Sequence, residues 1–484
     1  MKRTILNLIL LAASLSACAQ GDPLRFDPSK GERQTLTMPD GKLVEYMAWE
    51  GIPYVTNVED AAYQCLNFYA PLTDADLSNA PILLRNNVGG YMAAKAMRPS
   101  PTDATGRALS EGYAVCIPGS RGSNSTVTSE ADGTTVYTGR VPAGLLDLKA
   151  AVRYLRHNDD LMPGSAERIV SDGTSAGGAM SALLGATGNH PVYRDLLKAM
   201  GAADERDDIF AAVCYCPITD LDHADMAYEW LFSCTNGEER QLSPEQQAVS
   251  EELAAQYPAY LESLELKTKD GTLLTADNYL DYVKGFILQS AQRAVSETCQ
   301  LPDSIGILMY EPQRGGGGPR GGFGRGGSEF VRDVDMRQYL GYVARAARLK
   351  TPPAFDSQGL PQARQTPENQ AFGDSEGNSY NFTDYSLRKA TGDPSASLSQ
   401  EQRQRVWMMN PMNFITEEAA SKAPHWYIRH GARDTDTSFP VPVNLATKLL
   451  NNGYDVDFAL PWNRPHSGDY NLDDLFRWIA RLPR

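Results

Sequence analysis

The stretch that most constrains this chain is the pentapeptide 173–177, which reads Gly-Thr-Ser-Ala-Gly and fits the pattern G-x-S-x-G. It follows a short apolar run, Ile169-Val170, and precedes small and apolar residues at 178–184. This order predicts a strand, a sharp turn that carries Ser175, and a helix packed closely on the strand. Glycine at both ends of the pentapeptide lets the backbone turn that sharply without a clash of a Cβ atom. The stretch therefore predicts a serine nucleophile above the edge of a sheet; a glycine-rich turn with an idle serine is the alternative.

Strand-like and helix-like segments alternate on both sides of this pentapeptide. A hairpin is predicted first, from the runs 34–38 and 42–46 around the turn Pro39-Asp40-Gly41. Further segments are predicted as strands at 65–71, 81–85, 113–118, 209–216, 426–431 and 456–461, and as helices at 145–155, 445–450 and 475–480. Such alternation is typical of a mostly parallel sheet covered by helices. Together with the pentapeptide it predicts an α/β fold of the α/β-hydrolase type.

A long segment separates two of these predicted strands, since residues 221 to 422 lie between them. An α/β-hydrolase core needs only one helix there, and helix-start signals recur inside the segment at Ser243-Pro244-Glu245 and Ser399-Gln400-Glu401. Residues 315–327 are glycine except for Pro319, Arg320, Phe323 and Arg325, and they predict an exposed flexible loop. We therefore expect a core of residues 19–220 and 416–484, with a large, mainly helical lid domain, 221–415, inserted after the sixth core strand.

A serine hydroxyl is a weak nucleophile unless a base and an orienting carboxylate activate it, and this fold supplies them in the order Ser, acid, His. Asp434 follows the predicted strand 426–431, and His466 lies in the loop between the last strand and the last helix. Of the six histidines, only His466 occupies that loop. We predict the triad Ser175, Asp434 and His466. Asp220, which also follows a strand, is the alternative acid, or else it caps the next helix.

The oxyanion donors are predicted to be backbone N–H groups. One is that of Ala176, and the other belongs to the loop at Gly89-Gly90, which directly follows the predicted strand 81–85. The residues before these glycines are Asn86-Asn87-Val88 rather than the usual histidine-led motif, so a plain turn is the alternative interpretation of this loop.

The N-terminus has the features of a signal peptide, with Lys2 and Arg3 before an apolar run, 5–15, and small residues after it. Leu15-Ser16-Ala17-Cys18 resembles a bacterial lipobox, which predicts a lipoprotein-type signal sequence at 1–18, with cleavage before Cys18 and lipidation of Cys18 as the mature N-terminus; an ordinary secretory signal is the alternative. We expect an exported cell-envelope lipoprotein of the outer membrane or a periplasmic protein, held to the membrane by its lipid anchor only. No other stretch reaches the roughly 20 apolar residues of a transmembrane helix.

Charge and cysteine content narrow the range of partners. The net charge of −15 argues against a nucleic-acid partner and leaves small or neutral substrates open. Six of the seven cysteines remain after Cys18, and sequence cannot choose among their pairings. Cys116, Cys214 and Cys216 lie in apolar runs and are expected to be small core residues. Because Cys-x-Cys has the wrong spacing for a metal site and no second ligand pair accompanies it, no metal and no cofactor are expected.

Three blocks of sequence resemble the bacterial tannases, which are tannin acyl hydrolases. The blocks are Gly-Thr-Ser-Ala-Gly-Gly at 173–178, Cys-Pro-Ile-Thr-Asp-Leu-Asp-His-Ala-Asp-Met-Ala-Tyr-Glu-Trp at 216–230 and Arg-Asp-Thr-Asp-Thr at 433–437. The resemblance spans nearly the whole chain after the signal peptide. It implies hydrolysis of galloyl esters with release of gallate, and it implies the same triad of Ser175, Asp434 and His466.

The resemblance also implies three residues that bind the galloyl ring, namely Lys350, Glu368 and Asp436. A ring with three adjacent hydroxyl groups offers donors to carboxylates and acceptors to an ammonium group, which suits these residue types. A solvated surface charge is the alternative for each of them. The glycine-rich stretch 315–327 departs from the family pattern. Fungal-type tannases and feruloyl esterases place cysteines beside the serine and histidine, whereas Thr174 and Pro465 stand there in this chain.

Three functions remain open from the sequence. The first is a serine esterase that cleaves galloyl esters of small-molecule substrates through an acyl-enzyme. The second is a feruloyl or general carboxylesterase, and the third is a non-catalytic polyphenol-binding surface lipoprotein.

Overall fold

A computed structural model of the chain describes residues 21–297, 299, 301, 304–309, 330–360 and 366–483. The predicted signal peptide 1–18 with Cys18, and the glycine-rich segment 315–327, lie outside the described residues.

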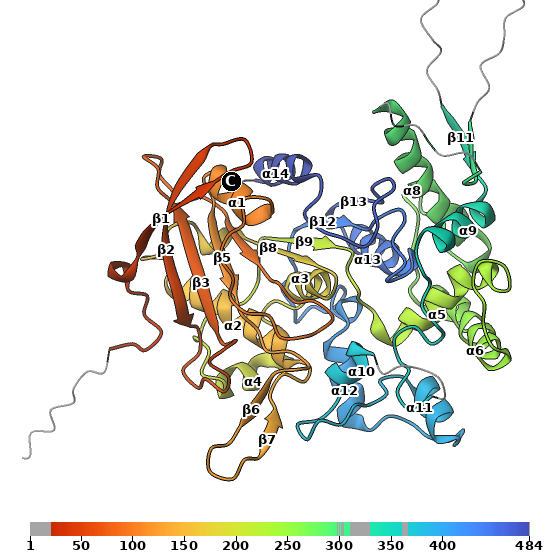
Figure 1. Ribbon diagram of the computed structural model, residues 1–484, viewed down its shortest axis with the longest axis horizontal. Helices are drawn as coiled ribbons and strands as arrows, with labels where there is room; N and C mark the ends of the chain where they lie inside the picture. Colours follow the sequence, from red (N-terminus) through yellow and green to blue (C-terminus); the bar gives the residue numbers. More distant parts are fainter. Residues whose placement is uncertain are drawn as a thin grey trace, which may run out of the picture.

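A nine-stranded sheet forms the centre of the larger part of the molecule, in the spatial order β1-β2-β3-β5-β4-β8-β9-β12-β13 (Figure 1). The first three strands pair antiparallel and β3 pairs antiparallel with β5, whereas β5, β4, β8, β9, β12 and β13 are parallel. The strands are β1 (Glu32–Thr37), β2 (Leu43–Pro53), β3 (Cys65–Pro71), β4 (Ile82–Arg85), β5 (Ala114–Pro118), β8 (Ile169–Thr174), β9 (Ala211–Tyr215), β12 (His425–Arg429) and β13 (Asp455–Ala459). The predicted α/β-hydrolase fold is confirmed.

Helices cover both faces of this sheet, as the alternation of buried side chains along its strands requires. In β4, Leu83 belongs to the apolar cluster that includes residues of α1 and α14, while Ile82 and Leu84 belong to the cluster that includes residues of α2, α3 and α13. The helices are α1 (Ala104–Ser110), α2 (Ala143–His157), α3 (Ala176–Ala186), α4 (Arg194–Ala199), α13 (Pro440–Asn451) and α14 (Leu472–Arg481). A small hairpin, β6 (Thr126–Thr128) with β7 (Thr135–Tyr137), stands apart from the sheet (Figure 1).

The chain between β9 and β12 is mainly helical. Its described elements are α5 (Leu221–Phe232), α6 (Pro244–Ala254), α7 (Tyr257–Ser263), α8 (Ala276–Ser296), β10 (Ile307–Met309), β11 (Val331–Val334), α9 (Met336–Ala346), α10 (Pro367–Ala371), α11 (Asp384–Thr391) and α12 (Gln400–Met408). Figure 1 shows them gathered on one side of the sheet, in green to light blue. We call them the inserted segment. They follow β9, which is the seventh strand of the sheet in chain order, or the sixth if the edge strand β1 is left out.

Local signals explain several of these elements. Ser243 caps α6 in a capping box with Gln246, and Ser399 caps α12, as their sequence signals predict. Cys116, Cys214 and Cys216 are buried free thiols, in keeping with the predicted core role. Within the described residues, no helix has the length and apolar content needed to cross a membrane.

Candidate active site

The predicted elbow is present at the end of β8. Ser175 adopts φ 88° and ψ −115°, a strained conformation for a residue other than glycine, and α3 begins at the next residue. A Cβ atom on Gly173 would lie 2.2 Å from the carbonyl oxygen of Gly177, and one on Gly177 would lie 2.8 Å from that of Val88. Both glycines are therefore required, because the strand, the helix and the neighbouring loop approach each other at backbone distance.

The loop 86–90 packs directly on this elbow. The side-chain amide of Asn86 donates to the carbonyl oxygen of Gly177 at 3.1 Å and to Ser181 Oγ at 3.0 Å. A Cβ on Gly89 would meet nothing within 4 Å, so the backbone there borders open space. The structure thus places the loop that carries Gly89 against the first turn of α3, which begins with Ala176; the oxyanion role of the two N–H groups stays a prediction.

Ser175, His466 and Asp434 form a continuous chain of contacts. His466 Nε2 lies 2.8 Å from Ser175 Oγ, and His466 Nδ1 lies 2.8 Å from Asp434 Oδ2. Since an ionised carboxylate only accepts, the proton on the ring belongs on Nδ1, which leaves Nε2 to accept from the serine hydroxyl. The side chain of Asp434 is fully buried, and that of His466 is 22% exposed.

The pKa values of Asp434 and His466 depend on each other and on neighbouring charges. Burial alone would raise the pKa of Asp434, but neighbouring His430 and the hydrogen bond from His466 outweigh it, so this pKa lies below the ordinary value. Burial lowers the pKa of His466, while the hydrogen bond and charge of Asp434 and the charge of Asp436 raise it, with a net rise. The site therefore favours a negative Asp434 next to a histidine of enhanced basicity, which is suited to general-base chemistry.

Two loops in contact with each other position Asp434 and His466. The backbone N–H of Arg433 donates to the carbonyl oxygen of Arg464 at 3.0 Å, and a Cβ on Gly431 would lie only 2.2 Å from that oxygen. The loops after β12 and β13 are thus in direct backbone contact. This contact explains how residues 32 positions apart meet at 2.8 Å.

Asp436 lies beside the base as well as beside the acid. Its backbone N–H donates to Asp434 Oδ1 at 2.9 Å, and its own carboxylate oxygen lies 3.6 Å from His466 Nδ1. The carboxylate is half-exposed, so it is accessible from the solvent side of the site.

Lys350 and Glu368 come from the inserted segment and approach the same place. The ammonium of Lys350 lies 4.1 Å from the centre of the Phe355 ring. Glu368, on α10, is buried, and its pKa is raised by burial and by the charge of Asp436, against the lowering effect of Lys350. Lys350 and Asp436 also act on the pKa of His466. The three residues implied to bind substrate therefore lie within electrostatic range of one another or of the base.

Tyr228 of α5 connects the inserted segment to the acid loop. Its hydroxyl donates to the carbonyl oxygen of Thr435 at 2.9 Å and accepts from the backbone N–H of Lys350 at 3.0 Å. The side chain is fully buried. One hydroxyl group thus fixes the segment with Lys350 relative to the loop with Asp434 and Asp436, a role that the sequence did not reveal.

Asp220, the alternative acid, lies elsewhere. Its carboxylate is bound by His223 at 2.8 Å, by Asn410 at 2.7 Å and by Tyr260, and not by His466. It occupies the N-cap position of α5 without making a side-chain capping bond. Its carboxylate therefore ties the start of α5 to α7 and to the end of the inserted segment.

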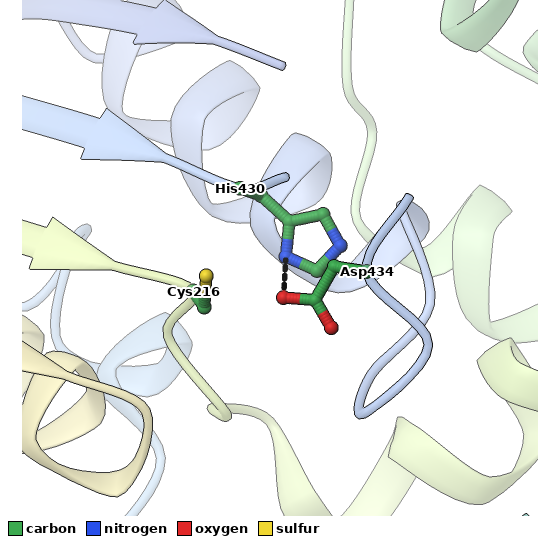
Figure 2. Close-up of side chains that lie close together, drawn as sticks. All are labelled: Cys216, His430 and Asp434. Carbon is green, nitrogen blue, oxygen red and sulfur yellow. Dashed lines mark ion pairs between the residues drawn. The ribbon is translucent and has the colours of Figure 1, made fainter. Parts of the chain in front are cut away.

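Two further side chains surround Asp434 from the core side. His430, at the end of β12, is fully buried with Nδ1 3.6 Å from Asp434 Oδ2, and Cys216 follows β9 (Figure 2). The sequence placed His430 at a strand end and Cys216 in the core, which is where they are. Their meeting at the acid depends on the adjacency of β9 and β12, which neither residue's local sequence reveals.

Comparison with known proteins gives the family. A family described as BD-FAE matches residues 72–262. Among solved structures, the tannase of Fusobacterium nucleatum is 36% identical with a TM-score of 0.81, and that of Lactobacillus plantarum is 35% identical with a TM-score of 0.82. A tannin acyl hydrolase in complex with ethyl gallate is 36% identical with a TM-score of 0.81. Each alignment covers 94% of this chain and 98% of the other.

The curated proteins include no match to this chain. The solved structures decide the assignment, because the identity exceeds one third over nearly the full length of both chains. The fold and the family's activity also make the chain a carboxylic ester hydrolase, so the alternative of a non-catalytic binding protein falls away. The chain belongs to the bacterial tannases, the tannin acyl hydrolases with an α/β-hydrolase fold.

Proposed function

We propose that this protein is a serine esterase that hydrolyses the galloyl ester bonds of tannins and simple gallate esters through a Ser175-His466-Asp434 triad and an acyl-enzyme. The observation that carries the proposal is the pair of 2.8 Å contacts that joins Ser175 Oγ, His466 and Asp434. The nucleophile, the base and the carboxylate that orients the base are all within hydrogen-bond reach.

The reaction proceeds in two halves. In the first, Ser175 Oγ attacks the ester carbonyl carbon while its proton passes to His466 Nε2, and Asp434 stabilises the resulting imidazolium. The backbone N–H groups of Ala176 and Gly89 bind the oxyanion. The imidazolium then gives its proton to the leaving alcohol. In the second half, water attacks the galloyl-enzyme with His466 as base, which releases gallate and restores Ser175.

Recognition of the galloyl ring is assigned to Lys350, Glu368 and Asp436. The two carboxylates accept hydrogen bonds from ring hydroxyl groups, and the ammonium of Lys350 donates to a hydroxyl oxygen. The burial of Glu368 supports this role, because a buried carboxylate without a ligand pays a desolvation penalty that three hydroxyl groups can offset. A site of this kind rejects rings that lack a hydroxyl group.

The test compares initial rates on methyl gallate and methyl ferulate for the wild type, Ser175→Ala and Ser263→Ala. Ser263 is an exposed serine at the end of α7 and serves as the matched control. We expect a preference for gallate, a loss of at least about 10³-fold in kcat for Ser175→Ala, and wild-type rates for Ser263→Ala. Mass spectrometry of quenched reactions should show one galloyl group on Ser175 of the wild type.

Two results would contradict the proposal in different ways. Full activity of Ser175→Ala would contradict the catalytic role of the triad. A preference for ferulate would be compatible with the triad and would favour a feruloyl or general carboxylesterase. The BD-FAE match is the observation that keeps this second function under test.

We further propose that the protein is exported and anchored to the cell envelope by a lipid on Cys18, or released to the periplasm if an ordinary signal peptidase acts. The basic residues Lys2 and Arg3, the apolar run 5–15 and the Leu-Ser-Ala-Cys sequence at 15–18 support export. Cys18→Ala should move the protein from the membrane fraction to the soluble fraction. A wild-type protein that is soluble and unlipidated would exclude the anchor.

A further inference from the structure

A buried cluster of three potential metal ligands lies on the core side of Asp434. Cys216 Sγ, a ring nitrogen of His430 and a carboxylate oxygen of Asp434 all lie within 4.8 Å of one another, and all three residues are buried. Figure 2 shows the side chains meeting from the ends of two adjacent strands, β9 and β12, and from the loop after β12. The tannase mechanism uses only one of them, Asp434.

His430 is the unexplained member of this cluster. Its side chain is fully buried, yet neither ring nitrogen has a hydrogen-bond partner among the described residues. A buried polar group without a partner costs free energy, so it requires a reason such as an ion. The ring is held in place by an edge-to-face contact with Phe439, which leaves Nδ1 directed at Asp434.

The donor types and one measured separation match zinc-type coordination. Thiolate, imidazole and carboxylate are the usual ligands of Zn²⁺. Nitrogen and oxygen ligands about 2.1 Å from a tetrahedral zinc ion lie about 3.4 Å apart, and His430 Nδ1 lies 3.6 Å from Asp434 Oδ2. Cys216 has a left-handed backbone with φ 46°, which a residue other than glycine adopts only where the surrounding structure imposes it.

Two other clusters of acidic residues with a histidine are weaker candidates for a metal site. In the group Asp220, Asp222 and His223, the side chains of Asn410 and Tyr260 already bind the carboxylates. In the group Asp434, Asp436 and His466, the ring nitrogen that faces the carboxylates is engaged in the 2.8 Å contact. Among the described residues of these three groupings, His430 supplies the buried ring nitrogens that lack a hydrogen-bond partner.

We propose that Cys216, His430 and Asp434 form a binding site for a thiophilic divalent cation such as Zn²⁺, and that an ion bound there inhibits the enzyme. Asp434 Oδ2 is the oxygen that accepts from His466 at 2.8 Å and also the one that faces His430. Coordination of this oxygen withdraws it from the base, so occupancy of the metal site and catalysis exclude each other. The inhibition rests on the role proposed for Asp434, whereas the binding does not.

Binding exchanges a proton for a metal ion, with no change of oxidation state. The Cys216 thiol donates to the carbonyl oxygen of Ser467 at 3.1 Å in the metal-free protein. On binding, the sulfur–metal bond forms, the thiol proton leaves to solvent, and the bond to Ser467 is lost. The prediction that no metal binds rested on the Cys-x-Cys spacing and on the lack of a second ligand pair nearby in the sequence. The histidine and the carboxylate of this site follow β12, more than 200 residues after Cys216.

Binding is tested by equilibrium dialysis of the EDTA-treated, untagged full chain against Zn²⁺. We expect one ion per chain for the wild type. Cys216→Ser and His430→Gln should each weaken binding by more than the roughly 10- to 100-fold that loss of an outer-shell partner costs. Cys234→Ser and His425→Gln are the matched controls, since Cys234 is exposed and His425 pairs with Asp455 at 2.9 Å outside the cluster; both should bind as the wild type does.

A second measurement does not depend on the variants folding. Co²⁺ added to the wild type should produce a thiolate-to-cobalt charge-transfer absorption, which Zn²⁺ then abolishes. Absence of bound zinc, a cobalt spectrum without that band, or wild-type affinity in both Cys216→Ser and His430→Gln would each overturn the site.

The inhibitory effect is tested separately on ester hydrolysis. Zn²⁺ at concentrations that saturate the site should abolish most of the wild-type rate, Mg²⁺ at the same concentrations should not, and EDTA should restore it. For the cluster variants the rate is normalised to each variant's own metal-free rate. A chain that keeps its rate with the ion bound contradicts the inhibition. A chain that binds the ion but hydrolyses no gallate ester in its metal-free state contradicts the proposed function instead.

Discussion

The basicity of His466 depends on charges from two separate parts of the chain. Burial lowers its pKa, the hydrogen bond and charge of Asp434 and the charge of Asp436 raise it, and Lys350 lowers it, with a net rise above the ordinary value. A protonated His466 cannot accept the serine proton. The elevated pKa therefore means that kcat/KM falls on the acid side at a higher pH than an ordinary histidine would cause.

Asp436→Asn and Lys350→Met should move this acid limb in opposite directions. Loss of the Asp436 carboxylate, 3.6 Å from His466 Nδ1, removes a charge that favours the imidazolium, so the limb shifts to lower pH by up to about one unit. Loss of the Lys350 ammonium shifts it to higher pH. The measurement is kcat/KM against pH on methyl gallate.

A control separates this effect from general changes in charge. Asp455 forms a comparable pair with His425 at 2.9 Å away from the triad, so Asp455→Asn should leave the profile unchanged. Shifts of Asp436→Asn and Lys350→Met in the same direction would contradict the electrostatic explanation.

The elbow between β8 and α3 tolerates no side chain at Gly173. An added Cβ lies 2.2 Å from a backbone oxygen and 2.4 Å from a backbone carbon of Gly177, so the backbone itself has to move. Gly173→Ala should lower the free energy of unfolding by about 1–3 kcal/mol or more. It should also lower kcat by about 10²-fold, because a displacement of about 1 Å misplaces Ser175.

Gly285→Ala is the matched control for this change. Gly285 lies inside α8, and an added Cβ there meets nothing within 4 Å. The change should raise stability by up to about 1 kcal/mol, because alanine favours a helix over glycine, and should leave kcat unchanged. Urea unfolding measures the stability, and steady-state kinetics measure kcat. If the two variants have the same stability and the same kcat, the close approach at Gly173 is not what excludes a side chain there.

The link between α5 and the acid loop is testable through a single hydroxyl group. Tyr228→Phe leaves the partly buried backbone N–H of Lys350 and the buried carbonyl oxygen of Thr435 without this partner, which should cost about 1–3 kcal/mol of stability. Because these backbone segments carry Lys350 and Asp436, KM for methyl gallate should rise as well.

Tyr54→Phe distinguishes the two consequences of that loss. Tyr54 is equally buried, and its hydroxyl donates to the carbonyl oxygen of Gly119 at 2.9 Å in the core. This variant should lose stability without a change in KM. An unchanged KM in Tyr228→Phe would mean that Lys350 and Asp436 keep their positions without the hydroxyl link.

Whether a feature of this fold could be predicted from the sequence depends on how far apart in the chain the interacting residues lie. The hairpin of β1 and β2, the caps Ser243 and Ser399, and the turn at Ser175 were predictable because the residues that form them are neighbours in the chain. His466 was identified by its position in the order of elements. The convergence of Cys216 and His430 on Asp434 was not predictable, since it arises from the pairing of β9 with β12 across more than 200 residues, with the inserted segment between them.

The proposed ring-binding residues come from both parts of the fold, the sheet with its helices and the inserted segment. Asp436 belongs to the loop after β12, while Lys350 and Glu368 belong to the inserted segment, and α10 packs on the loop 86–90 through Pro367, 3.7 Å from a Cβ placed on Gly90. A bound ring that contacts all three residues joins the two parts, so it should stabilise the molecule as a whole.

Gallate should therefore raise the midpoint of thermal unfolding. A ligand at about 100 times its Kd adds about 2.7 kcal/mol to the free energy of unfolding of the state that binds it. Lys350→Met, Glu368→Gln and Asp436→Asn should each reduce the shift at a fixed gallate concentration, whereas Lys389→Ala should keep it, because Lys389 pairs with Glu252 elsewhere in the inserted segment. If Asp436→Asn alone retains the full shift, the ring is held by the inserted segment, and the core contributes the chemistry but not the recognition.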